Sequence, residues 1–188
     1  MKKFNVAFML LFVFSISSKA QKQIPAQPVS LPVDSITKLI TYEGVTEAPG
    51  LKEDVLYKRF LSWFHTFYKN PAEVIRENDS LKFKITGKPR IRISNPPDKT
   101  GTKTDAGLVQ YTITVAAKEG RFKYEITAFN WKQTSYYACE RWMDTKSQTY
   151  ATVYPEYLKQ VDAYTIELIK NLKNSLLNEA PVKDKDKW

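Results

Sequence analysis

The sequence has few of the residues on which most catalytic and metal sites depend. Its 188 residues include one cysteine, one histidine and six glycines. A single cysteine cannot form an intramolecular disulfide, and one cysteine with one histidine cannot supply the usual Cys/His ligands of a structural zinc ion. The sequence also contains no glycine-rich phosphate loop and no Gly-x-Ser-x-Gly motif. We therefore expect no metal, no cofactor and no catalytic residues, and a core stabilised by packing.

Composition alone does not exclude one pair of residues that could act as a nucleophile and its base. Cys139 and His65 could in principle form a Cys–His pair. However, His65 falls on the polar face of a predicted helix, and no known family signature surrounds Cys139. We interpret Cys139 as a small buried hydrophobic residue, which is the commonest role of a free cysteine.

Long apolar runs are also absent except at the start of the chain. Lys2 and Lys3 precede an apolar run over 6–16, and Ser18-Lys19-Ala20 is typical of a signal peptidase site. The run is too short to span a bilayer, which needs about 20 residues. We expect residues 1–20 to be a cleaved signal peptide without a lipobox cysteine. The protein would then be periplasmic or secreted, with no membrane span after cleavage.

Removal of the signal peptide leaves a moderately basic chain. The segment holds three lysines and no acidic residue, so its loss lowers the formal net charge from +9 to +6. This charge favours anionic partners without identifying one. Composition divides the rest into a Pro/Gln-rich linker or cap at 21–34, a single α+β domain at 35–178, and a charged tail at 179–188.

Two amphipathic helices dominate the predicted domain. In residues 51–68, an apolar stripe at helical spacing contains Leu56, Phe60, Trp63, Phe64 and Phe67. Aromatic side chains bury roughly 150–250 Å² each, so this face needs a broad apolar partner, which a sheet can supply. A second amphipathic helix is predicted over residues 153–177.

Alternating apolar and polar residues predict the strands. They fall at 35–45, 73–77, 81–93, 108–117 and 121–131, and the last two form a hairpin. The order is strand, helix, four strands, helix. Only one face of each strand is apolar, so both helices should cover the same face. The sequence thus predicts a two-layer α+β domain with an antiparallel sheet of about five strands and one sheet face open to water.

The pattern over residues 36–131 resembles the domain of unknown function 4468 family. The shared features are a strand that ends at Gly44-Val45, a helix with an aromatic stripe centred on Trp63, the strand Val74-Ile75-Arg76 and a hairpin around Gly87. The resemblance implies a secreted protein, mostly of Bacteroidota, with a fold like that of the TATA-box-binding protein. The family has no known catalytic residues, so the resemblance assigns none here. Segment 133–152 has no clear counterpart in the family pattern.

Basic and aromatic residues alternate on the sheet face that is predicted to be open. The candidate ligand-binding residues are Lys82, Lys84, Arg90, Arg92, Lys123 and Trp131. We expect Lys84, Arg90 and Arg92 to make the main contacts with an anion, and Phe129 to project from the same face. Such a face could bind a polyanion or a glycan. The TATA-box-binding protein uses the equivalent face on DNA, but a shared fold does not transfer that function. A plain solvated face explains the same residues.

Three hypotheses about function follow from these observations. The first is a non-catalytic periplasmic or surface module that binds an envelope component or a protein through the open sheet face or the aromatic segment 133–152. The second is a binder of anionic polymers such as lipopolysaccharide, acidic glycan or nucleic acid. The third is a small hydrolase whose residues are not apparent from the sequence. In each case we expect a monomer or a weak homodimer.

Overall fold

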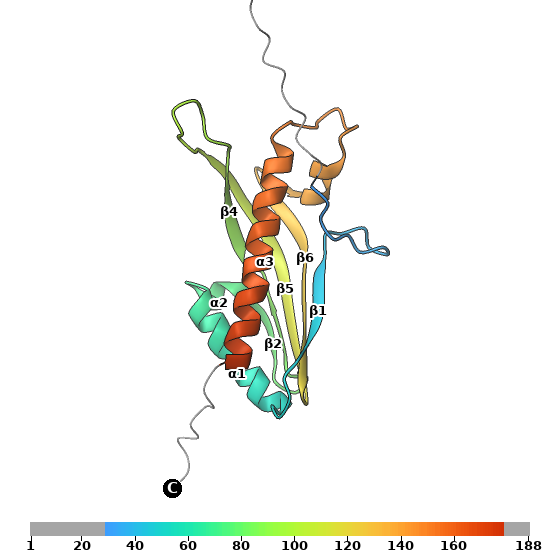
Figure 1. The fold of residues 1–188 in the computed structure, drawn as a ribbon, viewed down its shortest axis with the longest axis vertical. Helices are drawn as coiled ribbons and strands as arrows, with labels where there is room; N and C mark the ends of the chain where they lie inside the picture. Colours follow the sequence, from blue (N-terminus) through green and yellow to red (C-terminus); the bar gives the residue numbers. More distant parts are fainter. Residues whose placement is uncertain (1–28, 179–188) are drawn as a thin grey trace, which may run out of the picture.

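Residues 29–178, which the computed structural model describes, contain one seven-stranded antiparallel sheet covered on one face by helices (Figure 1). The elements in chain order are β1 (Tyr42–Glu47), α1 (Glu53–Phe67), α2 (Pro71–Val74), β2 (Ile75–Asp79), β3 (Lys84–Gly87), β4 (Arg90–Ser94), β5 (Asp105–Lys118), β6 (Arg121–Lys132), β7 (Tyr136–Ala138), the 3-10 helix η1 (Cys139–Met143) and α3 (Tyr154–Asn178). The predicted α+β class and the position of both long helices on one sheet face are confirmed.

The long hairpin of β5 and β6 forms the centre of the sheet. The strands lie in the order β1-β6-β5-β3-β2. β4 also pairs with β5, and β7 also pairs with β6. β3 and β4 therefore lie end to end along one edge of β5, with Gly87 opposite Ile113 and Arg90 opposite Gln110. The register is the same across the Lys88-Pro89 break, so β3 and β4 act as one interrupted strand. The hairpin expected around Gly87 is therefore wrong, because both segments pair with β5 and not with each other.

The aromatic stripe of α1 is buried as predicted. Phe60, Trp63 and Phe64 are fully buried against the sheet and α3. The Trp63 indole Nε1 donates a hydrogen bond to Asn171 Oδ1 of α3 at 2.8 Å, which ties the two helices together. α1 begins with two acidic residues, which favour a helix N-terminus. It ends at Phe67, shortly before Pro71, whose ring disfavours a helical conformation at the preceding residue.

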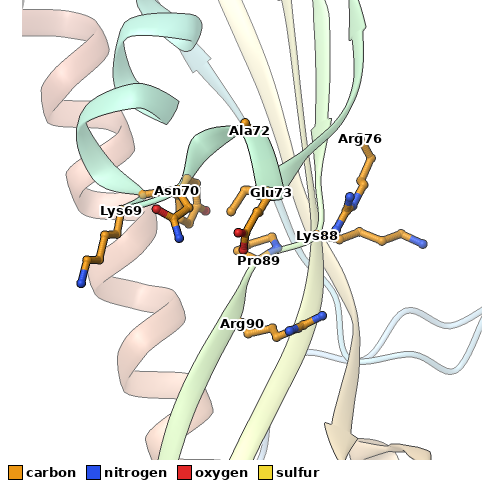
Figure 2. Close-up of a pocket in the computed structure, with 10 residues that line it drawn as sticks. Lys69, Asn70, Ala72, Glu73, Arg76, Lys88, Pro89 and Arg90 are labelled. Atoms are coloured by element: carbon orange, nitrogen blue, oxygen red, sulfur yellow. The ribbon is translucent and has the colours of Figure 1, made fainter.

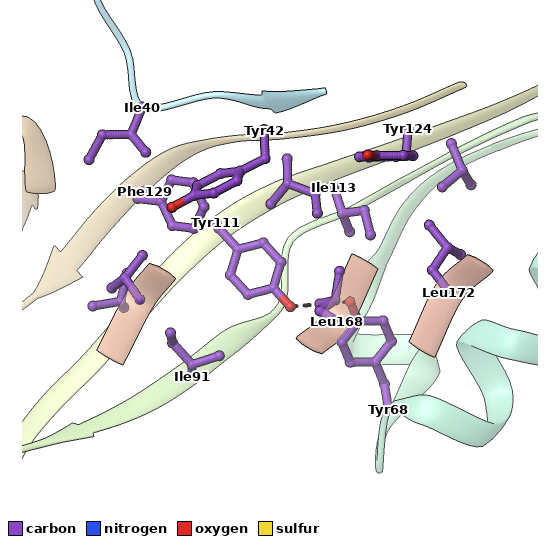
Figure 3. Packing of buried hydrophobic residues seen from close by; sticks show 14 of the residues in the cluster. Ile40, Tyr42, Tyr68, Ile91, Tyr111, Ile113, Tyr124, Phe129, Leu168 and Leu172 are labelled. Atoms are coloured by element: carbon purple, nitrogen blue, oxygen red, sulfur yellow. Dashed lines mark hydrogen bonds between the residues drawn. The ribbon is translucent and has the colours of Figure 1, made fainter. Parts of the chain in front are cut away.

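The face of α3 that packs on the sheet also follows the predicted spacing. Its buried apolar residues are Leu158, Val161, Leu168, Leu172 and Leu176. Figure 3 shows part of this core, with Tyr111 of β5 placed between the sheet and Leu168 of α3. Apolar burial at this interface is the main force that holds the two layers together.

Two strand boundaries differ from the sequence prediction. Residues 35–38 form a turn in which the Asp34 carboxylate accepts hydrogen bonds from the backbone N–H groups of Ile36 and Thr37, so the first strand begins only at Tyr42. The predicted strand at 73–77 starts two residues later, because Pro71 at the first helical position begins the short helix α2. In both places a local turn or cap overrides β propensity.

The predicted strand over 81–93 also begins later than expected. Leu81, expected to point inward, is 90% exposed and lies in the turn before β3. The Asp79 carboxylate accepts hydrogen bonds from the backbone N–H groups of Leu81 and Lys82, and this turn uses the residues that the alternation assigned to a strand. The alternation holds only from Lys84 onward.

A β-bulge in β6 reverses the predicted orientation of the residues that follow it. Gln110 lies opposite Asn130, but Thr112 lies opposite Thr127, so β6 contains one extra residue at this point. Ala128 takes up the irregularity with φ of 54°. The prediction that Phe129 projects from the open face was therefore wrong: Phe129 is fully buried.

The start of the described chain packs on the domain. Leu31 is buried in the core, and Val33 forms an isolated bridge with Ile40, so residues 29–34 act as a cap. The predicted signal peptide at 1–20, the rest of the proposed linker and the tail at 179–188 lie outside the described residues. Among the described helices, none has the length and apolar character needed to span a bilayer.

Candidate anion-binding site

The outer sheet face contains the predicted cations, but acidic neighbours pair with most of them. Lys84 Nζ lies 3.2 Å from Glu77 Oε2 on β2, and Lys82 Nζ lies 3.4 Å from Asp79 Oδ2. Hydrogen bonds from Lys84 and Thr86 hold the pKa of the Glu77 carboxyl below its ordinary value, so this partner stays negative at neutral pH. A ligand anion would have to compete with these carboxylates.

The same pairing occurs further along the face. Arg92 of β4 pairs with Asp105 at the start of β5. Lys123 Nζ lies 2.8 Å from Glu43 Oε2 on β1, and this contact raises the pKa of Lys123 above its ordinary value. These pairs are exposed, and each stabilises the fold by only about 0–1 kcal/mol. They offset positive charge over the centre of the face.

Trp131, the sixth predicted site residue, is on the other side of the sheet. The sequence placed it on the open face, but the bulge at Ala128 turns it toward the helices. Its ring lies 5.5 Å from that of Trp142 and 6.0 Å from that of Tyr157 between centroids. It therefore cannot act together with the outer-face cations.

Arg90, the remaining predicted residue, lines a cleft of about 420 Å³ with three further cations. The cleft lies between α2, the residues just after α1, and the β3–β4 junction (Figure 2). Lys69, Arg76, Lys88 and Arg90 contribute positive charge, and Glu73 is the one acidic residue in its lining. None of the four cations forms an ion pair with another residue of the described range 29–178. This cleft is the strongest concentration of unpaired positive charge that we find in the described structure.

The backbone around the two prolines shapes this cleft. The Lys88 backbone N–H donates to the Val74 carbonyl at 2.8 Å, and the Pro89 carbonyl accepts from the Tyr111 N–H at 3.2 Å. Arg76 lies at an irregularity in the pairing of β2 with β3, where the register shifts between Ile75 and Glu77. Because three backbone segments are fixed in this way, the bases of the cationic side chains are held on a rigid frame.

Tyr68 forms part of the cleft wall and leads into the core. Its hydroxyl lies 3.2 Å from the Tyr111 hydroxyl, which lies 3.0 Å from that of Tyr164; Figure 3 shows the first of these contacts. Burial raises the pKa of Tyr68 far above its ordinary value, so the phenol stays neutral at physiological pH. The cleft thus combines positive charge with a neutral aromatic wall, which suits binding of an anion.

The nucleophilic pair considered from composition is not assembled. Cys139 is fully buried in η1, and burial raises the pKa of its thiol well above the ordinary value. His65 is exposed on α1, in the opposite half of the molecule (Figure 1). The interpretation of Cys139 as a buried hydrophobic residue is confirmed. Within residues 29–178, no cluster of three or more His, Cys, Asp or Glu residues could hold a metal ion.

Comparison with known proteins adds the family. A family model described as a domain of unknown function (DUF4468) with TBP-like fold matches residues 42–132. Residues 42–132 of this chain belong to the DUF4468 family. The DUF4468 match runs from β1 to the end of β6 and so includes Arg76, Lys88 and Arg90. It ends before the aromatic segment 133–152 and α3.

Two solved structures have a similar fold. A DUF4468 family protein from Bacteroides ovatus is similar with a TM-score of 0.63 and 17% identity, over 79% of this chain and 91% of that one. A TBP-like protein from Parabacteroides distasonis is similar with a TM-score of 0.61 and 11% identity, over 78% of this chain and 97% of that one. The comparison with curated proteins found no match. At these identities the likeness establishes the TBP-like fold and no activity.

Sequence reasoning found Arg90 and did not select Lys69, Arg76 or Lys88 as site residues. A signal was nevertheless present, because Lys69-Asn70-Pro71 and Lys88-Pro89-Arg90 each place a cation within two residues of a proline. Proline interrupts regular elements, and irregular backbone between elements is where binding residues concentrate. What the sequence could not indicate is that the two interruptions lie side by side.

Proposed function

We propose that this protein is a non-catalytic binding module of the periplasm or cell surface, which recognises an anionic group of an envelope polymer or a protein partner. The observation that carries this proposal is the cleft lined by Lys69, Arg76, Lys88 and Arg90, since no carboxylate of the described chain pairs with them. A broad polyanion-binding face is less well supported, because most cations on the outer sheet face already pair with carboxylates.

The charge of the cleft gives the proposal its physical basis. Four like charges around one hollow repel one another, and a bound anion relieves that repulsion. The guanidinium groups of Arg76 and Arg90 can also hold a carboxylate, sulfate or phosphate through paired N–H donors. Nothing in the cleft supplies an activated nucleophile, so recognition accounts for these residues better than hydrolysis.

Salt-dependent retention on immobilised heparin tests the proposal. The cleft variant carries Arg76→Gln, Lys88→Gln and Arg90→Gln. We expect the slope of log retention against log salt to fall by about 2–3, because each lost anion contact releases roughly one counterion fewer. The fold should be unaffected, since the three side chains are exposed or half-exposed and have no ion-pair partner in the described chain.

A matched variant separates the cleft from general positive charge. Lys84→Gln, Arg92→Gln and Lys123→Gln remove the same formal charge from residues that already have acidic partners. We expect this face variant to lower the slope by less than about 1. Equal losses in the two variants would show that net charge alone drives retention and would overturn the proposal.

A further inference from the structure

The outer edge of β4 presents backbone N–H and C=O groups that pair with no strand of the described chain. The Pro89 carbonyl accepts a hydrogen bond from Tyr111, so at this point the backbone of the odd-numbered residue faces β5. Backbone direction alternates along an antiparallel strand, and the register stays constant from Arg90 to Ile93. The N–H and C=O groups of Arg90 and Arg92 therefore point away from β5. β4 pairs only with β5 in the described sheet.

The backbone on either side of Arg90 and Arg92 already has hydrogen-bond partners. At one end the Lys88 N–H bonds to the Val74 carbonyl, next to the strand β2 that occupies the same row beside β3. At the other end the side-chain amide of Gln160 donates to the Ser94 carbonyl at 2.9 Å and accepts from the Ser94 N–H at 3.0 Å. Gln160 thus makes the pair of hydrogen bonds that a neighbouring strand would make. Between Lys88 and Ser94, no strand of the described chain lies beside β4 on the side away from β5.

The open edge leads directly out of the cationic cleft. Lys88 and Arg90 belong to both, and Figure 2 shows Arg90 at the β4 end of the cleft. A second hollow of about 170 Å³, which Ser94 and Lys103 help to line, lies at the far end of the edge. The distance from Lys88 to Ser94 is about 20 Å at 3.3 Å per residue. It accommodates an extended peptide of about five to seven residues.

The charges along this path determine the kind of peptide that fits. The cleft contributes its four cations against Glu73, and Arg92 on the edge shares Asp105. At the far end, Lys103 and Glu156 both line the second hollow, and Glu156 is already paired with Lys159. A second copy of this edge would bring Arg90 and Arg92 against like charges, which disfavours self-pairing. An acidic strand would find unpaired positive charge where it lies beside the cleft, at Lys88 and Arg90.

We propose that an extended acidic segment of a partner protein adds to the sheet alongside β4, with its carboxylates toward the cleft and the Arg90 side chain. This inference rests on the proposed function, because it identifies the anionic partner of the same cleft. Main-chain hydrogen bonds to Arg90 and Arg92 supply part of the affinity, and the cationic side chains select the acidic sequence.

The test uses a fluorescent, acetylated seven-residue peptide of alternating glutamate and valine. Saturating peptide should slow amide hydrogen exchange of Arg90 and Arg92 at least tenfold. A heparin oligosaccharide of similar charge is the control probe: it satisfies the cations but cannot pair with a strand edge, so it should leave these two amides unchanged. The cleft variant described above should lose at least tenfold in affinity for both probes.

A backbone variant isolates the edge from its charge. Arg92→Pro removes an N–H that points away from β5, so the ladder with β5 stays intact. Arg92→Gln removes the same charge and keeps the N–H. We expect Arg92→Pro to bind the peptide at least tenfold more weakly than Arg92→Gln, with equal heparin binding.

The outcomes separate the two proposals. Three results would overturn strand addition and leave the anion-binding function standing, provided that heparin binding depends on the cleft. They are the absence of amide protection, the absence of peptide binding, and equal peptide affinity of the two Arg92 variants. Heparin and peptide binding that ignore the cleft variant would overturn both. Because amide exchange is measured on the unaltered protein, the test does not depend on the folding of any variant.

Discussion

Two aromatic clusters lie in opposite halves of the helix–sheet interface, and the chain builds them in different ways (Figure 1). The first consists of Trp63, Phe64, Phe67 and Tyr68, all from α1 and its end, with Trp63 stacked on Phe67 at 4.9 Å between centroids. The second combines Trp131 of β6, Trp142 of η1 and Tyr154 and Tyr157 of α3. One cluster is local in sequence, and the other unites three separate elements.

The difference also shows in how completely each cluster is enclosed. Trp63 is buried between α1, the sheet and α3. The second cluster borders an open pocket of about 210 Å³, which Trp131, Trp142 and Tyr154 help to line. A cluster contributed by one helix can be covered completely when that helix docks. A cluster assembled from three elements retains a gap where they meet.

Replacement of Trp63 should give the largest effect on stability. Trp63→Ala removes a fully buried ring and its hydrogen bond to Asn171. We expect the free energy of unfolding to fall by about 3–5 kcal/mol, from lost transfer energy and the cavity left behind. Urea denaturation measures this directly. A fall below about 1 kcal/mol would contradict the central role of the α1 cluster.

Replacement of Trp142 should cost less, although the same ring is removed. The space left by Trp142→Ala would join the existing pocket, so water can enter and the cavity contribution shrinks. We expect a fall of about 2–3 kcal/mol in the same urea assay. A loss equal to that of Trp63→Ala would show that the two clusters are equally enclosed and would remove the contrast between them.

The bulge that orients Trp131 predicts a smaller effect of opposite sign. Ala128 adopts φ of 54°, a conformation that costs a residue with a Cβ roughly 1–2 kcal/mol. We expect Ala128→Gly to raise the free energy of unfolding by about 0.5–1 kcal/mol.

Ala116→Gly, in a regular part of β5, is the matched control and should lower the free energy of unfolding by about 0.5–1 kcal/mol. Equal losses at both positions in urea denaturation would mean that the bulge stores no strain. The position of Trp131 would then need another explanation.

The parts of the fold that sequence predicted well are those with a regular period. α1, α3 and the β5–β6 hairpin each have a long apolar repeat, and their faces follow from it. The errors arose where one residue breaks the period. The bulge at Ala128 reversed Phe129 and Trp131, and the turn capped by Asp79 exposed Leu81. A regular pattern of apolar residues does not show where an extra residue or a turn interrupts it.

The candidate site was less predictable for a related reason. Ion pairs such as Lys84–Glu77 and Lys123–Glu43 depend on which residues lie opposite each other on neighbouring strands. Alternation shows the face of each cation but not its cross-strand partner, so paired and unpaired cations looked alike. Arg90 and Lys84 both point outward from the sheet, and only Lys84 has an acidic partner in the described chain. That partner comes from a chain segment that the sequence gives no means to align.

The pairing of β1 with β6 has a consequence for how the chain is made. Tyr42 lies opposite Ile126, and α1 covers residues of β5 and β6, so β1 and α1 are synthesised well before the strands that they pack against. Their apolar faces stay uncovered until the hairpin has been synthesised. The hairpin, joined by a short turn, can form as soon as it appears because little chain entropy opposes its closure. Folding of the domain is thus delayed until most of its residues have been synthesised.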